Sequence, residues 1–547
     1  MEEFSFFSRD LLLKNLQSET YDVVVIGGGV TGAGIALDAA SRGLKTALVE
    51  KADFAFGTSS RSTKLIHGGL RYLKQLEFGL VKEVGSERAV VHNLAPHLVV
   101  PEKMLLPLSE KKGLGYWLTS IGLMLYDWLA GVKAEDQRRM LTKFQTLKYE
   151  PLLKKDDVKG GAIYAEYRTD DARLTIELIK QSRKHKADIL NYIKVSDFIY
   201  VGDRVAGVVC FDQFSQKEFT LTANVVVNAA GPWVDDLREV NKSKQGKRLH
   251  LTKGVHIVVP WEKLPVSQAI YFDVDDGRMI FAIPRGRITY IGTTDTNYTG
   301  DKDHVVATKD DAVYLIDAVN AMFPSVNIAV HDIESSWAGL RPLIHEDGKS
   351  ASELSRKDEI FESATGLISI AGGKLTGYRK MAERVVTLIV KKYFADRRLK
   401  ECHTHQLKLA ETNFSNKREI KGYHDKVYQI LKAYDFDFTV VRHLVETYGR
   451  QTDLILHEFK RLVASNTPAL ALMKAELWFT SRYEMVCGLT DFFVRRTGLL
   501  YFDAPRMNAY KDDIALELQR YLNWDEARLQ QEKQSLEHYF KTVTSFN

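Results

Sequence analysis

The sequence predicts an α/β fold followed by an all-helical C-terminal domain, and three features of the chain point to it. A strand–helix–strand unit with a glycine-rich turn spans residues 22–50. Alternating apolar and polar residues with tight turns between Lys253 and Thr294 predict antiparallel strands. After about residue 400 the spacing becomes helical and strand-like runs are few. We therefore expect a parallel α/β domain interleaved with an antiparallel sheet, and then a helical domain.

The first unit carries a dinucleotide-binding fingerprint. Asp22–Ile26 predicts a buried strand, after which Gly27, Gly29 and Gly32 form the pattern G-x-G-x-x-G. These glycines allow a tight turn, a close approach of a pyrophosphate and close helix–strand packing, while the helix offers free N–H groups. The second strand ends on Glu50, whose carboxylate can accept both ribose hydroxyls. This context favours a bound dinucleotide over a purely structural turn.

A polar loop follows, where an NAD-binding domain would proceed to another strand. Its sequence GTSSRSTKLIHGGLRYL, residues 57–73, is rich in Gly and Ser and contains four basic side chains. Such a loop suits a second pyrophosphate contact and the edge of a flavin. The pattern GGGVTGAG followed by SSRSTKLIHGGLRYL closely resembles the FAD-dependent glycerol-3-phosphate dehydrogenases, and the resemblance extends along almost the whole chain.

The resemblance implies a glutathione-reductase-like FAD-binding domain interleaved with an antiparallel-sheet substrate domain. The FAD-binding domain would occupy residues 1–399, in segments of about 20–110, 150–250 and 345–399. The substrate sheet would be inserted at about 105–150 and 250–345, and residues 400–547 would form the helical C-terminal domain.

Local patterns predict the elements in chain order. Residues 1–20 predict a short helix with Phe4, Phe7, Leu11 and Leu12 on one face. The run 331–343 predicts a strand that ends in an Arg-Pro turn, and a long helix is expected from about Leu375. Further helices are expected at 76–97 and 172–186, strands at 105–108, 160–171, 192–201, 205–211 and 223–228, and a hairpin at 359–362 and 367–370.

Composition narrows the class of protein. The 547 residues suffice for two or three domains, and the net charge of +5 is too weak to indicate nucleic-acid binding. Three scattered cysteines favour a reducing, cytosolic location. The segment Cys402-His403-Thr404-His405 has no zinc-site spacing, so we expect an exposed linker there and no metal.

No membrane-spanning or targeting segment is predicted. The N-terminus lacks the features of a signal or transit peptide, and no apolar run reaches a charge-free span of about 20 residues. Gly113–Gly131 is apolar nearly all round and rich in aromatic residues. It suits either a buried or inter-domain helix, or a helix or hairpin that touches lipid or quinone.

Cationic residues lie at strand ends and glycine-rich turns. Arg341 occurs in GLRPL, Arg356 in LSRKDE and Lys374 in GGKLT. A phosphate monoester needs several charged donors, and Arg supplies planar bidentate hydrogen bonds, although surface arginines can also simply solvate a loop. The resemblance implies that these three contact the substrate, together with residues of the first loop and strand: His67, Arg71, Tyr72 and His256.

His256 alternates with apolar neighbours in KGVHIVVP, which by itself is typical of a core or edge histidine. The resemblance implies an active-site position, and an imidazole that titrates near pH 6.5 suits general-base catalysis. His67 is the rival base, while Lys374 as an ammonium can only stabilise a developing alkoxide. The residues expected at the chemical step are His256, Arg341, Lys374, His67 and Arg71.

Non-covalent FAD is expected to contact the fingerprint, the polar loop, the adenosine side near NAAGPW and the turn before the helix from Leu375. These residues are Gly27, Gly29, Gly32, Glu50, Thr58, Ser59, Ser60, Lys64, His67, Gly68, Gly69, Val195, Ala230, Gly231, Trp233, Gly372, Gly373, Lys374, Leu375 and Thr376.

The resemblance implies oxidation of sn-glycerol 3-phosphate to dihydroxyacetone phosphate by hydride transfer to FAD, with electrons passed to a membrane quinone. It implies a cytoplasmic protein in peripheral contact with the inner face of the cell membrane, with a homodimer as a candidate assembly. The nearest alternative is a glycerol-3-phosphate oxidase that uses O2, whose family members carry an inserted segment not found here. An amine or amino-acid oxidase and a non-enzymatic flavin sensor are further alternatives, but neither would need the three cations together.

Overall fold

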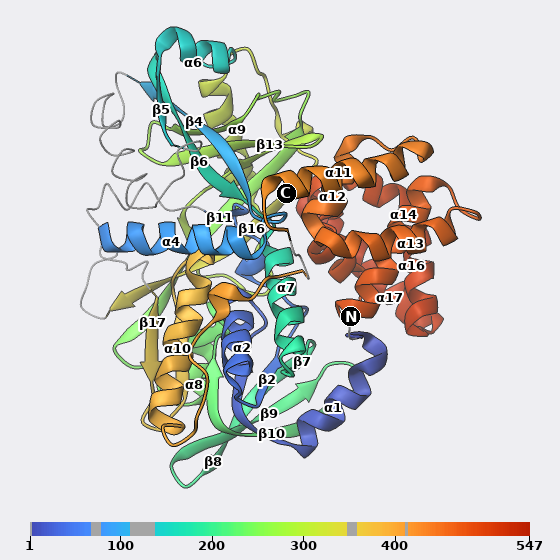
Figure 1. Cartoon of the computed structure of the whole chain (residues 1–547). Helices are drawn as coiled ribbons and strands as arrows, with labels where there is room; N and C mark the ends of the chain where they lie inside the picture. Colours follow the sequence, from blue (N-terminus) through green and yellow to red (C-terminus); the bar gives the residue numbers. More distant parts are fainter. Residues whose placement is uncertain (1–2, 67–77, 110–136, 347–357, 411–413, 547) are drawn as a thin grey trace.

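The computed structural model describes residues 3–66, 78–109, 137–346, 358–410 and 414–546. Within these ranges the strands form an eight-stranded and a ten-stranded sheet. Figure 1 shows the first sheet in the lower half of the view, the second above it, and the C-terminal helices, orange to red, beside both. The predicted α/β fold with a helical C-terminal domain is thus confirmed.

The first sheet has a parallel centre, because β1 pairs in parallel with β10 and β2, β10 with β18, and β2 with β7. The antiparallel strands β8 and β9 extend from β10, and β17 pairs with β18. Its strands are β1 (Thr20–Ile26), β2 (Thr46–Val49), β7 (Asp188–Leu190), β8 (Ile193–Val201), β9 (Arg204–Asp212), β10 (Lys217–Asn228), β17 (Glu359–Glu362) and β18 (Ile368–Ala371).

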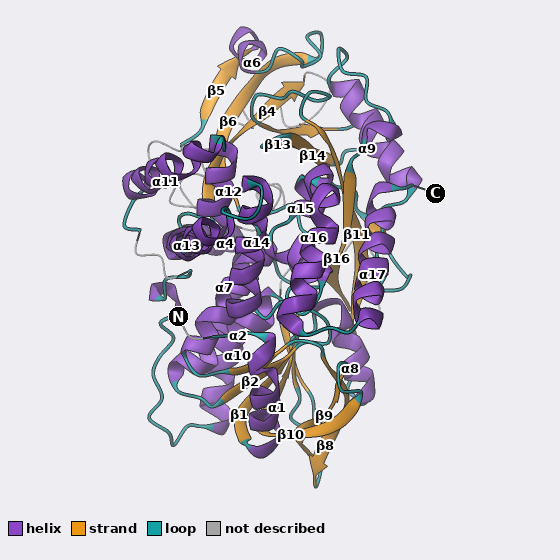
Figure 2. Ribbon diagram, turned by 90° about the vertical axis from the view of Figure 1, so that its right-hand side faces the viewer, coloured by secondary structure: helices purple, strands orange, loops and turns teal. Residues whose placement is uncertain are grey.

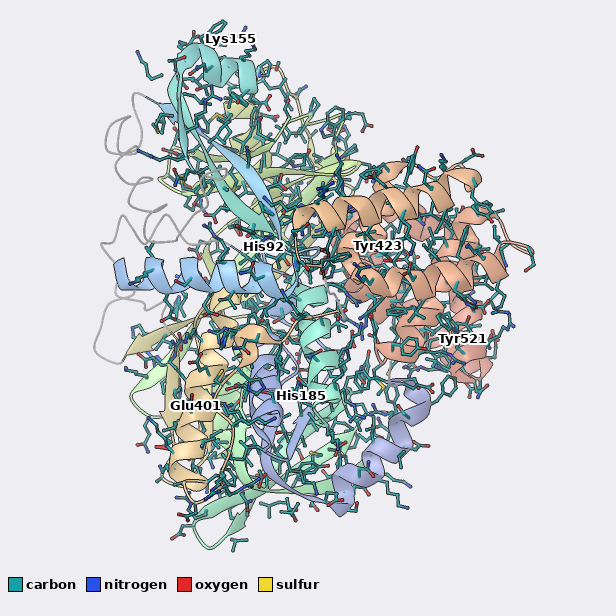
Figure 3. The ribbon with its side chains drawn as sticks, viewed as in Figure 1. His92, Lys155, His185, Glu401, Tyr423 and Tyr521 are labelled. Atoms are coloured by element: carbon teal, nitrogen blue, oxygen red, sulfur yellow. The ribbon has the colours of Figure 1, made fainter. Side chains whose placement is uncertain are left out.

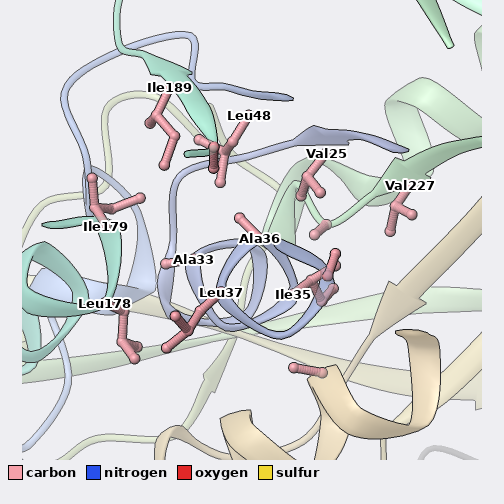
Figure 4. Packing of buried hydrophobic residues seen from close by; sticks show 14 of the residues in the cluster. Val25, Ala33, Ile35, Ala36, Leu37, Leu48, Leu178, Ile179, Ile189 and Val227 are labelled. Carbon is pink, nitrogen blue, oxygen red and sulfur yellow. The ribbon is translucent and has the colours of Figure 1, made fainter. Parts of the chain in front are cut away.

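Among the helices that pack on this sheet are α2 (Val30–Arg42), α7 (Asp171–Lys184) and α10 (Tyr378–Tyr393). Figure 4 shows Ala33 and Ala36 of α2 close to apolar side chains of the strands, with Leu178 and Ile179 of α7 nearby. A small residue also lets α2 pack closely on α10, since a Cβ at Gly34 would lie 3.0 Å from the Tyr378 ring of α10. The close packing holds the glycine-rich turn rigidly against the sheet.

The second sheet is built from segments far apart in the chain, in the order β15-β11-β14-β13-β12-β4-β6-β3, with β16 on β11 and β5 on β6. In the described part its pairing is antiparallel except for β12 with β4. Its strands are β3 (Leu65–Ile66), β4 (Val100–Ser109), β5 (Arg139–Thr142), β6 (Val158–Arg168), β11 (Lys247–Pro260), β12 (Ala269–Asp273), β13 (Met279–Arg285), β14 (Ile288–Gly292), β15 (Thr296–Asn297) and β16 (Ser335–Glu346).

The chain crosses between the two sheets at places that the sequence analysis did not foresee. β3 and β6 pair with strands of the second sheet, although residues 20–110 and 150–250 were assigned to the FAD-binding domain. β6 belongs to the second sheet because it pairs with β4 from Val158 to Arg168. The outer helices of this half are α6 (Lys143–Tyr149) and α9 (Lys309–Met322), while α4 (Phe78–Leu94) and α8 (Val234–Val240) complete this part of the chain.

Two local predictions differ from the structure. The first α-helix, α1 (Arg9–Ser18), begins late, so Phe7 and Leu11 are 56% and 63% exposed while Leu12 and Leu16, four residues apart, face the protein. No turn occurs at Arg341-Pro342, because β16 continues to Glu346 with Pro342 opposite Leu251. In the described part β16 pairs with β11 alone, and an edge strand tolerates a proline that cannot donate a hydrogen bond.

The C-terminal helices pack on the edge of the second sheet. Figure 2 shows α16 and α17 beside β11 and β16. The hydroxyls of Ser335 and Ser336 donate to the main-chain oxygens of Tyr501 at 2.6 Å and Val543 at 2.9 Å. None of the described helices combines the length and apolar character that a membrane crossing requires. The helices are α11 (Lys417–Leu431), α12 (Phe438–Tyr448), α13 (Thr452–Leu462), α14 (Pro468–Tyr483), α15 (Leu499–Phe502), α16 (Ala504–Leu522) and α17 (Glu526–Thr544), with a π-helical turn at Asp491–Arg496.

Candidate active site

The carboxyl ends of four parallel strands meet at one edge of the first sheet. β1 leads into Gly27, β2 into Glu50, β10 into Ala229 and β18 into Gly372. All four residues line one cavity of about 1350 Å³. Ligands of open parallel sheets bind outside the carboxyl ends of the strands, and ordinary ligand pockets measure about 300–1,000 Å³. The cavity therefore has room for an elongated cofactor and a small substrate together.

Most residues that the sequence analysis assigned to the cofactor lie on the wall of this cavity. His67, Gly68 and Gly69 lie outside the described residues, as do the predicted substrate contacts Arg71, Tyr72 and Arg356 and the segment Gly113–Gly131. The predicted cofactor residues on the wall are Gly27, Gly29, Glu50, Thr58, Ser59, Val195, Ala230, Gly231, Trp233, Gly372, Gly373, Lys374, Leu375 and Thr376.

The glycine-rich turn has the shape that a pyrophosphate requires. Gly27 has a φ of +111°, and a Cβ there would lie 2.6 Å from the oxygen of Ala229. Gly32 is not part of the cavity lining but packs against the turn. A side chain has no room there, since a Cβ would lie 1.9 Å from the Gly27 oxygen. Gly29 is the N-cap of α2 and offers no side chain to cap it; the Val30 N–H donates to Ser59 Oγ at 2.9 Å, and the positive end of the helix dipole faces the cavity for an anion.

Glu50 is held in place by the main chain. Its Oε2 accepts a hydrogen bond from the Gly28 N–H at 2.6 Å, and its Oε1 accepts one from the Ala52 N–H at 2.9 Å. Burial raises the pKa of Glu50, and the two N–H donors oppose that rise. Each carboxylate oxygen can accept a further hydrogen bond, so the residue fits the ribose hydroxyls.

Lys64 and Ser60 are described residues that lie outside the cavity lining, so the structure does not support their assignment to the cofactor. The Lys64 ammonium pairs with Asp171 at 2.5 Å and donates to the Ser60 oxygen at 3.2 Å, in a fully buried position. This ion pair fastens the polar loop to the start of α7. The sequence could not reveal it, because the two charges lie 107 residues apart.

A second turn faces the cavity after β18. Gly372 and Gly373 have φ values of +81° and +78°, and a Cβ at Gly373 would lie 2.6 Å from the sulfur of Met381. Lys374 precedes the short helical turn Leu375–Gly377, which leads directly into α10. The positive end of the helix dipole at this helix start can stabilise partial negative charge on a flavin carbonyl.

Arg341 is fixed by three acceptors on the segment after β14. Its guanidinium donates to Thr293 Oγ1 at 2.8 Å, the Thr294 main-chain oxygen at 3.1 Å and Asp295 Oδ1 at 3.3 Å. It lies over β11, where a Cβ at Gly254 would approach its Nη2 to 2.3 Å. The side chain remains 30% exposed, which leaves it accessible to an anion in the cavity.

His256 is buried on β11, at the cavity wall, with 1% of its surface exposed. Its ring stacks on Trp337 at 4.8 Å and 11°, and its Nε2 lies 3.0 Å from Thr63 Oγ1. Nδ1 is buried and has no hydrogen-bond partner among the described residues. Burial, followed by the charges of Arg341 and Lys64, lowers the pKa of His256 well below its usual value. The lowered pKa favours the neutral imidazole, which can accept a proton but is a weaker base than a free histidine.

Sequence reasoning missed the residues that hold these groups. Thr63 and Trp337 support His256 from positions far away in the chain, and no local pattern connects them to it. Thr293 and Asp295 could have been noticed, because TTDT is a polar run at the end of a predicted strand.

The segment around Cys402 is only partly exposed. Arg379 of α10 donates to Thr404 Oγ1 at 3.3 Å, and the Cys402 sulfur lies 3.3 Å from the same oxygen. Across the described ranges there is no group of three or more His, Cys, Asp or Glu side chains that could hold a metal ion.

Comparison with known proteins places the chain in a family. A family model described as FAD dependent oxidoreductase matches residues 22–379, and one described as the C-terminal domain of alpha-glycerophosphate oxidase matches residues 402–529. The aerobic glycerol-3-phosphate dehydrogenase of Staphylococcus haemolyticus (strain JCSC1435) is 48% identical over 529 residues, which cover 96% of this chain and 95% of the relative. The chain belongs to the family of aerobic glycerol-3-phosphate dehydrogenases.

Solved structures agree with membership of this family of FAD-dependent oxidoreductases. The glycerol-3-phosphate dehydrogenase of Bacillus halodurans, solved in complex with FAD, is 42% identical with a TM-score of 0.84, over 99% of this chain and 98% of its own. An L-alpha-glycerophosphate oxidase from Mycoplasma pneumoniae shares the fold at 20% identity and a TM-score of 0.56, over 70% of this chain and 96% of its own. The expected cofactor, FAD, is confirmed for the family, and the turn at Gly27 has the shape that its pyrophosphate requires.

Proposed function

We propose that this protein oxidises sn-glycerol 3-phosphate to dihydroxyacetone phosphate and passes the electrons through FAD to a membrane quinone. The observation that carries the proposal is that Arg341, Lys374 and the buried His256 line the same cavity as the glycine-rich turn. The 48% identical relative, an aerobic glycerol-3-phosphate dehydrogenase, supports the same substrate.

The roles of the side chains follow from their charge and position. Arg341 binds the phosphate dianion through its positive charge, while Thr293 and Asp295 hold the guanidinium in place, and Lys374 adds a second positive charge. His256 accepts the proton of the C2 hydroxyl, since burial keeps its ring unprotonated. When bound, FAD supplies the acceptor for the hydride that leaves C2.

His256 and Arg341 act from adjacent strands, because Lys247–Val258 of β11 pairs with the whole of β16. Thr63 and Trp337 fix the imidazole from the edge and the face, so the ring is oriented before the substrate enters. Such pre-orientation lowers the entropic part of the barrier.

One steady-state experiment tests this function and its alternatives. Purified enzyme is supplied with glycerol 3-phosphate and a soluble quinone analogue, beside an oxygen electrode, with glycine as a control substrate. We expect quinone reduction without matching oxygen uptake, and no turnover of glycine. Oxygen consumed in proportion to oxidised substrate would instead assign the oxidase reaction.

The proposal includes peripheral contact with the inner face of the cell membrane from the cytoplasm, and a homodimer as the candidate assembly. The outer end of the second sheet supports the membrane contact, because Phe144 on α6 is 77% exposed and Arg139, Lys143 and Lys148 beside it are exposed too. Figure 3 shows Lys155 at the same end of the molecule. An exposed aromatic ring among cations suits an anionic lipid surface.

A vesicle-binding experiment tests this contact. We expect the full chain to sediment with vesicles that contain anionic phospholipid, to release at high salt, and to bind more weakly as Phe144→Ser. Equal binding to neutral vesicles at every salt concentration contradicts the contact. Sedimentation of the protein in the absence of lipid shows whether it forms the expected homodimer.

A further inference from the structure

A buried aspartate in the loop after β2 is held by two arginines of the C-terminal helical domain. Oδ2 of Asp53 accepts hydrogen bonds from Arg495 Nε at 2.5 Å and Arg496 Nη1 at 2.8 Å. Its Oδ1 accepts from Arg496 Nη2 at 2.9 Å and Asn191 Nδ2 at 3.1 Å. The carboxylate is fully buried, and its lone pairs are used by these four donors.

The C-terminal domain prepares both arginines for this contact. Arg495 and Arg496 end the π-helical turn Asp491–Arg496, a rare helical form that is common at functional sites. Arg495 pairs with Asp491 at 2.7 Å, and Arg496 donates to the main-chain oxygen of Glu484 at 2.7 Å. Each guanidinium is thus oriented by its own domain.

On its other side, the Asp53 loop touches the dinucleotide-binding turn. The Ala55 N–H donates to the oxygen of Gly28 at 3.0 Å, while the Gly28 N–H donates to Glu50 at 2.6 Å. The Phe54 ring packs against Gly28 so closely that a Cβ there would lie 2.9 Å from the ring. The loop therefore determines the position of Gly28, between the two glycines that face the cavity.

Both ends of the same loop reach the cavity wall. Glu50 and Lys51 line it at one end, and Phe56, Gly57 and Thr58 line it at the other. Asp53 lies at the middle of the loop, where the Phe56 N–H bonds to its main-chain oxygen at 3.1 Å. No described residue of the C-terminal domain lines the cavity itself.

We propose that Asp53, Arg495 and Arg496 couple FAD binding to the docking of the C-terminal domain. Arg495 and Arg496 act as positioning residues: they hold Asp53, Asp53 holds its loop, and the loop holds Gly28 and Glu50 in the geometry that accepts the dinucleotide. Because coupling between two binding equilibria is reciprocal, bound FAD in turn favours the docked C-terminal domain.

Two conservative variants of the full chain test the coupling. Asp53→Asn removes the charge at constant shape, and Arg496→Lys removes the bidentate hydrogen bonds but keeps a cation. We expect each to raise the dissociation constant of FAD, measured by the fluorescence of released flavin, by about tenfold or more, as for loss of a charge-assisted hydrogen bond. Arg495→Lys, which leaves Arg496 in place, should have a smaller effect.

A matched control removes another ion pair between the C-terminal domain and the rest of the chain. Glu446 on α12 pairs with Arg168 of β6 at 3.0 Å, away from the Asp53 loop. Glu446→Gln should leave the FAD dissociation constant close to that of wild type. If Asp53→Asn and Arg496→Lys lower the melting temperature but bind FAD as tightly as wild type, the contact is purely structural and the coupling is overturned.

A measurement on the wild-type chain covers the case in which the variants do not fold. Limited proteolysis is followed on holoenzyme and on protein from which FAD has been removed, at the segment 484–496. The reciprocal effect predicts slower cleavage there when FAD is bound, with restoration after FAD is added back. Identical cleavage with and without FAD overturns the proposal.

Discussion

The two ends of the cavity differ in the chemical groups that line them. At the dinucleotide end, the cavity is lined by main-chain turns at Gly27 and Gly372 and by the start of α2, with Glu50 held by main-chain N–H groups. At the substrate end, side chains act, and each depends on a partner from elsewhere, as His256 does on Thr63 and Arg341 on Thr293. Substitutions at the first end should therefore change the affinity for FAD, whereas substitutions at the second should change turnover of the substrate.

The largest effect should come from His256. Loss of a general base typically costs about 10²–10⁴ in rate, so His256→Ala should lower kcat by that factor while FAD stays bound. Steady-state kinetics and flavin absorbance measure the two quantities separately. A near-normal kcat in His256→Ala, together with its loss in His67→Ala, would transfer the role of base to His67.

The pH profile of the wild-type enzyme sharpens the same assignment. Burial, Arg341 and Lys64 lower the pKa of His256 from 6.5, so the neutral, proton-accepting form persists well below that pH. The acid limb of kcat should accordingly lie below pH 6.5 and vanish in His256→Ala. An acid limb that persists in the variant would belong to another group.

Arg341→Ala should have the next largest effect. Removal of one charge-assisted hydrogen bond costs about 1.5–3 kcal/mol, a factor of roughly 10–150 in kcat/KM for glycerol 3-phosphate. The weak background rate with glycerol, which has no phosphate, should change little. Equal losses on both substrates would show that Arg341 only supports the segment after β14.

At the dinucleotide end, Glu50→Ala should release FAD more readily while kcat per bound FAD stays near wild type. We expect the FAD dissociation constant to rise by about tenfold, because the charged acceptor of the ribose hydroxyls is lost. Acid precipitation should release all the cofactor as FAD, without covalent attachment. Release of NAD or FMN instead would refute the assignment of the turn.

The smallest effect should come from Thr63→Val. The variant keeps the shape of the side chain but loses the hydroxyl on His256 Nε2, a neutral hydrogen bond worth about 0.5–1.5 kcal/mol. We expect kcat to fall several-fold with unchanged FAD affinity, and Thr63→Ser to restore it. Loss of FAD from Thr63→Val would show that the substrate end of the cavity also affects the affinity for FAD.

The comparison also explains what the sequence could predict. The dinucleotide end was predictable because G-x-G-x-x-G, the strand before it and Glu50 lie within 30 residues and obey local rules. The ion pair of Lys64 with Asp171 could not be predicted from the sequence, because it depends on the tertiary fold. Likewise, an Arg-Pro pair favours a turn locally, yet β11 extends β16 past Pro342. Local patterns predict most of the secondary structure, while partners across the sheets decide where a strand ends and which contacts a single side chain makes.

The placement of β16 has a consequence for the design of smaller flavoproteins. This strand carries Arg341 and Trp337, and its first residues are bonded to Tyr501 and Val543 of the last helices. Trp337 also packs against the ring of Tyr501 at 5.3 Å. A designer who trimmed the helical domain to obtain a two-sheet enzyme would leave two serine hydroxyls and an indole facing water behind His256. A miniature version would therefore need a substitute cover for β16 before any redesign of the active site.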